Sequence, residues 1–261
     1  MNNNDQDGYD ETLYKFAEYR ETNVRQPVEH YTIHNCMLKQ FLDKDGLLTG
    51  KRVLDLACGH GYYTRELKAL GCSYILGIDE SPTMIALARD SKWHCSEDIE
   101  YMVADVKSLP PLQSSFDLIT AFYLFDYAQT SDELLSMVRF IYAQLGESKT
   151  FIGVIGNVTG GKDMFNNRKY GITRETKLPF DGDLLPDSTG IIVTMYDTQD
   201  MPMCSFSNYH YSPTTYEQVF KEVGFKTFQW VPYQCDPNDP NGTFFEDLIH
   251  NAPSIGIIAT K

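Results

Sequence analysis

The sequence predicts an α/β protein whose mostly parallel sheet is covered by helices on both faces. Between residues 52 and 157, short apolar segments alternate with segments of helical spacing, and the same pattern returns after residue 212. Strands that alternate with helices in this way indicate βαβ units and a parallel sheet. The chain is 42% hydrophobic, so it can also bury a full core.

Seven segments have the apolar character of buried strands. They comprise residues 52–57, 73–79, 99–105, 116–125, 149–157, 226–231 and 254–261. The intervening helices have recognisable ends. Ser81 is placed to cap a helix that begins at Pro82, and Gly71 ends the helix before it. We therefore expect a single sheet of seven strands.

Two regions depart from this pattern. Residues 1–8 are rich in Asn and Asp and are expected to be disordered, whereas residues 9–45 have helical spacing and form a predicted helical lid. The main domain is expected to span residues 46–261. Within it, residues 158–211 contain two predicted strands with no helix between them, so we expect an antiparallel insertion that covers the substrate.

The composition limits the classes of partner. The formal net charge is −14, with 22 basic and 36 acidic residues and no dense basic block. Nucleic-acid binders and proteins that dock on anionic membranes rely on basic patches, so a small-molecule substrate is favoured. The chain has no long apolar run and no signal-peptide pattern, and its six cysteines form no CxxC pair. We expect a cytoplasmic monomer or homodimer with free thiols and no metal site.

The segment Val53–Gly61, VLDLACGHG, lies where the first predicted strand meets the first helix. Small residues at Ala57, Gly59 and Gly61 allow a tight turn and a close approach of the backbone to a ligand. One interpretation is a dinucleotide site with the fingerprint GxGxxG. Thr64 stands where that fingerprint needs its third glycine, which opposes close packing of helix on strand.

VLDLACGHG resembles the first motif of the class I S-adenosylmethionine-dependent methyltransferases, usually written D-x-G/A-x-G-x-G. The resemblance implies a Rossmann-like fold and S-adenosylmethionine as cofactor. It also implies that Asp55, Ala57, Gly59 and Gly61 form the loop that holds the methionine and ribose portions. His60, inside this loop, is expected to point outward and to contribute only its backbone.

Further positions match the same family. Asp79 ends the second strand, where an ionised carboxylate can accept both ribose hydroxyls, and Glu80 follows it. Asp105 ends the third strand, where the family's acid takes the adenine amino group. By the same resemblance, Met84 and Val106 sandwich the adenine ring.

The resemblance extends from about residue 9 to the end of the chain. Within the class, the sequence resembles the UbiE-like small-molecule group, near the toxoflavin-biosynthesis type of N-methyltransferase. The segments that carry this likeness are residues 28–32, 168–171, 207–225 and 255–261. They are looser than the first motif and do not identify the acceptor.

Methyl transfer is an in-line displacement, so the residues beside the methyl group position the acceptor. Phe122 and Tyr123, at the end of the fourth strand, are the candidates for this place because aromatic faces suit its cationic character. The resemblance suggests that Tyr19 and Arg25 close over the cofactor and bind its carboxylate.

A general base helps if the acceptor carries an acidic N–H or O–H group. The candidates for the catalytic groups are His210, His30 and Asp126, with Tyr209 and Asn157 as residues that orient the substrate.

The favoured function is methyl transfer to nitrogen or oxygen of a small aromatic or heterocyclic acceptor. Two alternatives are open: an NAD-dependent Rossmann oxidoreductase and a catalytically silent methyltransferase-like module. Protein and nucleic-acid methylation are disfavoured because Ala121-Phe122-Tyr123-Leu124 replaces the Asn/Asp-Pro-Pro-Tyr/Phe signature of many such enzymes.

Overall fold

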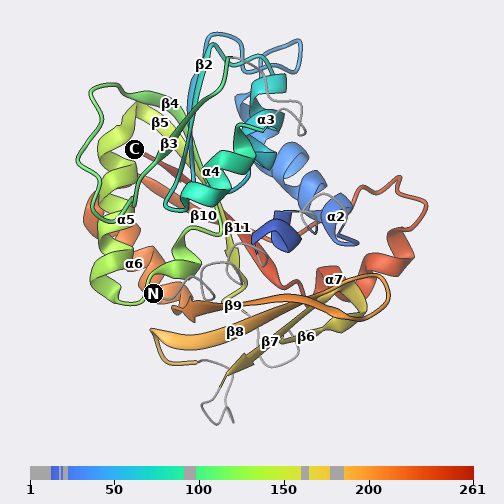
Figure 1. Cartoon of the computed structure of the whole chain (residues 1–261). Helices are drawn as coiled ribbons and strands as arrows, with labels where there is room; N and C mark the ends of the chain where they lie inside the picture. Colours follow the sequence, from blue (N-terminus) through green and yellow to red (C-terminus); the bar gives the residue numbers. More distant parts are fainter. Residues whose placement is uncertain (1–12, 18, 20–22, 91–97, 160–164, 177–184) are drawn as a thin grey trace.

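The structure is a computed structural model of the 261-residue chain (Figure 1). It describes residues 13–17, 19, 23–90, 98–159, 165–176 and 185–261. The expectation of disorder for residues 1–8 lies outside the described residues. In the described part of the chain, no helix combines the length and the apolar character needed to cross a membrane.

The central sheet has seven strands in the order β10-β11-β5-β4-β1-β2-β3. The strands are β1 (Arg52–Leu56), β2 (Tyr74–Asp79), β3 (Glu100–Val103), β4 (Phe116–Phe122), β5 (Leu145–Gly156), β10 (Thr227–Val231) and β11 (Ser254–Thr260). β11 pairs antiparallel with both of its neighbours, and the other pairs are parallel. The predicted seven-stranded, mostly parallel sheet is confirmed.

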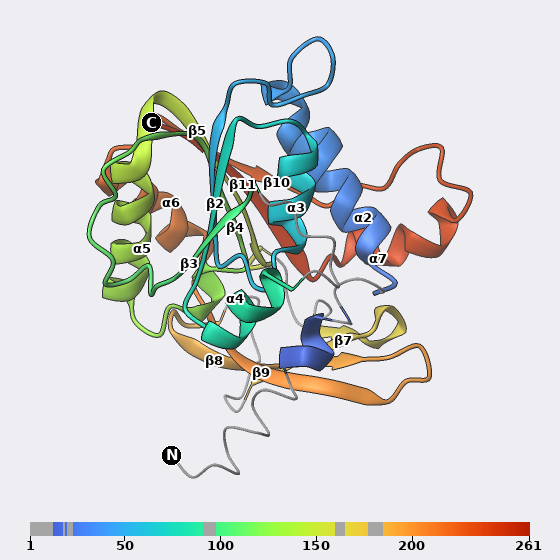
Figure 2. The same cartoon turned by 45° about the horizontal axis from the view of Figure 1, so that its top comes forward.

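Helices cover both faces of this sheet (Figure 2). α5 (Ser131–Gln144) and α6 (Pro213–Val223) pack on one face, where they share a core with Leu54 and Ile119. α3 (Tyr62–Ala69) packs on the other face with α2 (Gln26–Tyr31), η1 (Thr32–Leu38) and η2 (Lys39–Phe41). The core there includes Val53 and Leu118. Neighbouring residues along β1 and β4 therefore enter opposite cores, as strand geometry requires.

The helices end where the local sequence indicates. α4 (Pro82–Ala88) begins with Pro82, and the Ser81 side chain accepts a hydrogen bond from the backbone N–H of Met84 at 3.2 Å. Gly71 follows the end of α3 and has a φ of 81°, in the left-handed region. These features are the expected N-cap, first-turn proline and C-terminal glycine.

The predicted lid divides into two parts. Residues 13–17 and 19 are helical and lie apart from the sheet, whereas α2, η1 and η2 form a core helix. Val28, Ile33 and Met37 are fully buried there. The apolar stripe of residues 26–41 therefore packs against the sheet.

A second sheet contains four antiparallel strands in the order β6-β7-β8-β9. They are β6 (Asn166–Asn167), β7 (Ile172–Thr176), β8 (Thr189–Tyr196) and β9 (Pro202–His210). β8 and β9 correspond to the two predicted strands, whereas β6 and β7 are strands that the sequence did not predict. The second sheet lies across one end of the central sheet (Figures 1 and 2).

The described part of the chain also contains short helices that the sequence did not predict. Two short 3-10 helices lie at η4 (Phe125–Tyr127) and η6 (Arg168–Tyr170). The turn-rich segment before the last strand is followed by η7 (Gly242–Phe245) and α7 (Glu246–His250). Phe245 and Leu248 are buried against the core around η1, which explains why so short a segment becomes helical.

Candidate active site

The bend between β1 and α3 has the backbone geometry that its small residues allow. Ala57, Gly59 and Gly61 have φ values of 53°, 56° and 81°, all in the left-handed region. A Cβ atom at Gly61 would overlap the hydroxyl of Tyr101. Ala57 adopts this conformation with a side chain, at a cost of about 1 kcal/mol. The bend therefore turns tightly and presents backbone rather than side chains.

Asp79 holds this bend from the end of β2. Its Oδ2 accepts a hydrogen bond from the backbone N–H of Gly59 at 2.8 Å, and its Oδ1 accepts one from the N–H of Ser81 at 2.9 Å. Burial raises the pKa of Asp79, and these two N–H donors oppose the rise. Each carboxylate oxygen keeps lone-pair capacity for one further donor.

A cavity opens beside the bend at the carboxyl ends of the parallel strands. Ten residues predicted for the cofactor line it: Asp55, Ala57, Gly59, Asp79, Glu80, Met84, Asp105, Val106, Phe122 and Tyr123. Gly61 lies in the bend but does not line the cavity. Open α/β sheets bind ligands at this edge, because loops from neighbouring strands diverge there.

Asp55 supports the bend from below. It is buried, and its two oxygens accept hydrogen bonds from the hydroxyls of Thr64 at 2.6 Å and Thr120 at 2.7 Å. Burial raises its pKa to about 6, although both threonines oppose this. Thr64, which displaces the third glycine of a dinucleotide fingerprint, therefore has a specific partner beneath the bend.

The far end of the cavity combines a carboxylate with apolar walls. Asp105 accepts a hydrogen bond from the backbone N–H of Lys107 at 2.9 Å and lies 3.8 Å from the Lys107 ammonium group. Met84, from α4, and Val106 are both 5% exposed and line the cavity. These residues leave a slot with apolar walls and one acidic edge.

The orientation of His60 differs from the predicted one. His60 was expected to point outward, but it is 2% exposed and lines the cavity. Its carbonyl oxygen accepts a hydrogen bond from the Arg65 guanidinium at 2.6 Å, which fixes the bend from the outer side. The tight turn explains the error, because it directs residue 60 inward between two glycines with positive φ.

Comparisons with known proteins agree with this geometry. Residues 53–146 match the family model described as a methyltransferase domain. Demethylmenaquinone methyltransferase from Lactococcus lactis is 32% identical over 93 residues, which are 34% of this chain and 37% of that protein. The alignment thus spans little more than a third of that relative's length.

Two further proteins cover more of the chain. Ubiquinone biosynthesis O-methyltransferase from Coxiella burnetii is 22% identical over 164 residues, 60% of this chain and 70% of that protein. The crystal structure of an S-adenosylmethionine-dependent methyltransferase from Clostridium acetobutylicum has a TM-score of 0.61 and 19% identity. It covers 95% of this chain and 98% of that one, which shows a shared fold. Residues 53–146 therefore match a methyltransferase domain, and the chain has the class I methyltransferase fold.

In this methyltransferase domain, Phe122 and Tyr123 lie at one side of the cavity. Tyr123 has a φ of 70°, and its backbone N–H donates to the carbonyl of Val154 at 2.6 Å. The Phe122 ring lies 4.3 Å from the ring of Tyr63, which also lines the cavity. Aromatic surfaces therefore enclose this end of the site.

A buried glutamate connects these aromatic residues. Glu29 accepts hydrogen bonds from the hydroxyls of Tyr123 at 2.6 Å and Tyr233 at 3.1 Å, and a short one from Tyr63. Glu29 is 2% exposed, and the Tyr123 hydroxyl also lies 3.3 Å from Ser254 Oγ. Glu29 and Tyr63 were not among the residues predicted from the sequence. Glu29 belongs to the segment 28–32 that resembles the family, and this likeness is the signal in the sequence that could have identified it.

Tyr19 and Arg25 do not line the cavity. Arg25 is 1% exposed and donates to the Tyr19 hydroxyl at 3.0 Å, which in turn donates to the carbonyl of Gly171 at 3.1 Å. The two residues thus bond to each other and to the second sheet outside the lining of the cavity, and their contact with the cofactor carboxylate stays a prediction. Leu13 and Phe16 line the cavity in their place.

The predicted catalytic residues are dispersed. His210 and Tyr209 lie at the end of β9 and pair with β8, and neither lines the cavity. Burial lowers the pKa of His210. Tyr209 borders a separate hollow on the second sheet. The pairing of β9 with β8 therefore places both residues away from the cavity. This pairing is a tertiary contact, which the local sequence does not specify.

Asp126 lies nearer the site but faces another direction. Both of its oxygens are 3.0 Å from the backbone N–H of Gly156, and Asn208 Nδ2 is 3.4 Å from Oδ2. Burial raises the pKa of Asp126 to about 6, and the Gly156 N–H and Arg174 oppose the rise. Asn157, predicted to orient substrate, instead donates its side-chain amide to the carbonyl of Ala252 at 2.9 Å.

Proposed function

We propose that this protein transfers the methyl group of S-adenosylmethionine to a nitrogen or oxygen atom of a small aromatic or heterocyclic acceptor. One observation carries the proposal: the bend of β1 and the carboxylates that follow β2 and β3 line a single cavity. The match of residues 53–146 to a methyltransferase domain supports it.

The residues of the cavity fit the cofactor in chemistry and in space. A Cβ atom at Gly59 would meet no atom within 4 Å, so the bend leaves room for a ligand against its backbone. Asp79 has free lone pairs for the ribose hydroxyls, and Asp105 has them for the adenine amino group. Met84 and Val106 offer apolar faces to the adenine ring. When bound, the cofactor supplies a sulfonium methyl group.

The acceptor is proposed to bind beside Phe122 and Tyr123. Phe122, Tyr63 and Tyr127 present aromatic surfaces to the same cavity, and such surfaces favour a flat acceptor and a methyl group of cationic character. One relative is named a demethylmenaquinone methyltransferase and the other a ubiquinone biosynthesis O-methyltransferase, which supports a ring-bearing acceptor.

Tyr123 and Glu29 are the proposed route for the acceptor proton. The Tyr123 hydroxyl donates to the Glu29 carboxylate at 2.6 Å, and Tyr123 lines the cavity. Glu29 can take the tyrosine proton as the tyrosine takes one from the acceptor, so no charged phenolate accumulates. This pair replaces His210, Tyr209 and Asp126 as the proposed proton acceptor.

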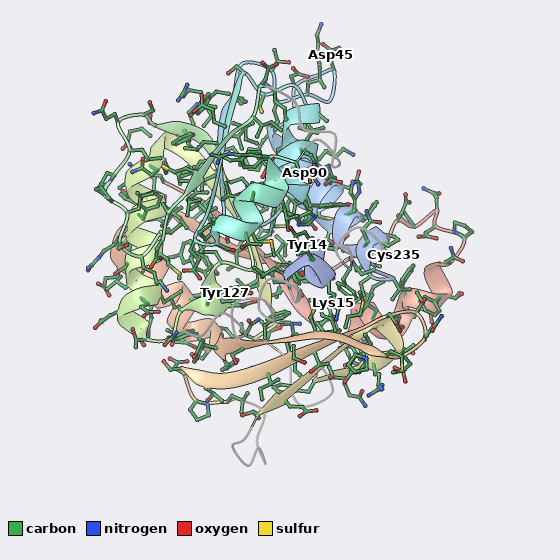
Figure 3. All side chains as sticks on the ribbon, in the orientation of Figure 1. Tyr14, Lys15, Asp45, Asp90, Tyr127 and Cys235 are labelled. Carbon is green, nitrogen blue, oxygen red and sulfur yellow. The ribbon has the colours of Figure 1, made fainter. Side chains whose placement is uncertain are left out.

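Residues 13–17 and 19 are the proposed cover of the cavity. Leu13 and Phe16 line it, and Phe16 packs edge-on against Phe206 of the second sheet, with ring centroids 5.8 Å apart. Tyr14 and Lys15 mark this helical segment in Figure 3, where it lies between α4 and the second sheet. A hinged segment here would admit ligands and then exclude water.

The decisive experiment is calorimetric titration with S-adenosylhomocysteine. Asp79→Asn removes the charge and one acceptor while keeping the side-chain shape. We expect binding to weaken by roughly 10- to 150-fold, because hydrogen bonds to charged groups contribute about 1.5–3 kcal/mol. Asp45→Asn is the matched control: it removes the same charge from an exposed loop at the opposite end of the molecule (Figure 3).

The outcomes distinguish the proposed function from its alternatives. Saturable binding that Asp79→Asn weakens and Asp45→Asn leaves unchanged supports the cofactor site. No heat from S-adenosylhomocysteine, or equal affinity in the Asp79 variant, contradicts it, and heat from NAD alone supports the oxidoreductase alternative. Incubation with phenols and heterocyclic amines then tests turnover; binding without any turnover would favour the silent module.

A further inference from the structure

Three potential metal ligands gather outside the active site. His30 belongs to α2, His34 to η1 and Glu66 to α3. None of them lines the active-site cavity. One metal-ligating atom from each residue lies within 4.8 Å of the other two, and all three residues are partly exposed. An ion could reach them from solvent.

The geometry comes from helical spacing and from packing between helices. His30 and His34 are four residues apart on the continuous α2–η1 helix, so they share one face. Their rings stack with centroids 4.0 Å apart and planes 17° from parallel. His30 Nε2 lies 3.5 Å from Glu66 Oε1, and His34 Nε2 lies 3.1 Å from Glu66 Oε2. Both imidazoles therefore direct the same nitrogen toward one carboxylate.

These separations are close to those of a bound tetrahedral ion. Zinc–ligand bonds of about 2.0–2.2 Å place neighbouring ligand atoms of a tetrahedron about 3.3–3.5 Å apart. The two histidine–carboxylate distances already fall near this length. These two distances end on different oxygens of Glu66, so one bound ion would also require the imidazoles and the carboxylate to rotate toward a single point.

The electrostatics also favour a metal ion. Burial lowers the pKa of His30, the neighbouring His34 lowers it further, and Glu66 opposes them. A neutral imidazole has a lone pair for a metal, whereas a protonated one has none. Two imidazoles with one carboxylate suit zinc and its transition-metal neighbours and do not suit magnesium or calcium.

We infer that His30, His34 and Glu66 bind one divalent transition-metal ion, with zinc as the best fit. The ion would link the α2–η1 helix to α3, whose first turn begins at the cofactor bend. Solvent can fill the fourth coordination position, since the side chains of His30 and Glu66 are 42% and 25% exposed. The site is independent of the proposed methyl transfer, and its cysteine-free ligand set explains why a search for CxxC pairs did not find it.

The test uses the full chain without a polyhistidine tag, stripped of metal with a chelator and titrated with zinc chloride. We expect one saturable zinc site in the wild type. His30→Ala and His34→Gln should each weaken it about tenfold or more, since loss of even an outer-shell partner costs that much. Zinc should raise the melting temperature of the wild type and not that of these variants.

Two controls separate this site from adventitious binding. His250→Ala removes a histidine from the exposed end of α7, and Cys36→Ser removes the thiol nearest to His34 in sequence. Both should bind zinc as the wild type does, and magnesium should produce no shift. The inference fails if the wild type shows no saturable site, if His30→Ala and His34→Gln keep full affinity, or if either control loses it. The cluster would then be a simple histidine–carboxylate contact.

Discussion

The bend that begins α3 offers a sharp test through two alanine substitutions. In Gly61→Ala, the new side chain meets two obstacles. The φ of 81° costs about 1–2 kcal/mol for a residue with a Cβ atom. The Cβ atom would also overlap the Tyr101 hydroxyl and lie 3.1 Å from Arg65 Nη1.

Tyr101 cannot move away easily. It is 8% exposed and packs with Cys58 and Ile85, and its ring lies against the backbone of Gly77, where a Cβ atom would approach it to 2.8 Å. Overpacking of this kind typically costs about 1–3 kcal/mol. Gly61→Ala should therefore lower the free energy of unfolding by roughly 2–5 kcal/mol.

Gly59→Ala is the matched comparison. Its φ of 56° carries the same backbone cost, but no atom lies within 4 Å of the added Cβ atom. We expect a loss of only about 1–2 kcal/mol. Because Gly59 lines the cavity, the added methyl group should reduce affinity for S-adenosylhomocysteine out of proportion to this small loss of stability.

Urea unfolding monitored by fluorescence measures both free energies, with the slope of each transition checked for two-state behaviour. The reasoning is refuted if the two variants lose equal stability, or if Gly61→Ala loses no more than the backbone cost alone. In either case the contact between Tyr101 and the bend would not determine the choice of glycine at residue 61.

Two more predictions concern buried carboxylates. Burial raises the pKa of Asp126 from 3.8 to about 6, so the native state binds this proton more tightly than the unfolded state does. The resulting stabilisation is fully present below pH 3.8. About 3 kcal/mol of it is lost as the pH rises through about 6. Asp126→Asn should remove this share of the pH dependence in unfolding measured from about pH 4 to 7.5, and an unchanged profile would contradict the assignment. Glu29→Gln replaces an acceptor of three tyrosine hydroxyls with an amide that offers one oxygen. Chemical denaturation should show a loss of about 1.5–3 kcal/mol, and no measurable loss would mean that the three contacts contribute little.

The sequence predicted the central sheet because local pattern and chain order specify it. Alternating apolar strands and helices, together with caps such as Ser81, indicate βαβ units before any contact is known. The cofactor bend was equally accessible, since Ala57, Gly59 and Gly61 occupy alternate positions within one strand–helix junction. Asp79 and Asp105 follow the next two strands, so the parallel order alone brings them to one edge.

In the N-terminal segment, the hydrophobic pattern alone is not sufficient to predict where a helix packs. Residues 26–41 have an amphipathic spacing that suits a lid as well as a core helix. Packing against the sheet, with Ile33 and Met37 fully buried, selects the core helix. Among the described N-terminal residues, Leu13 and Phe16 line the cavity, and Phe16 also packs against the second sheet.

The sequence by itself determined the fold class, the bend and the carboxylates beside it, because each depends on residues that are close along the chain or on the order of parallel strands. The tertiary structure alone revealed the contacts on which the proposed proton route and the proposed metal site rest. Tyr123 meets Glu29 across 94 residues, and His34 meets Glu66 across 32, through the packing of separate helices and strands. No local pattern records such contacts, since they are fixed only when the core excludes water and brings distant segments together.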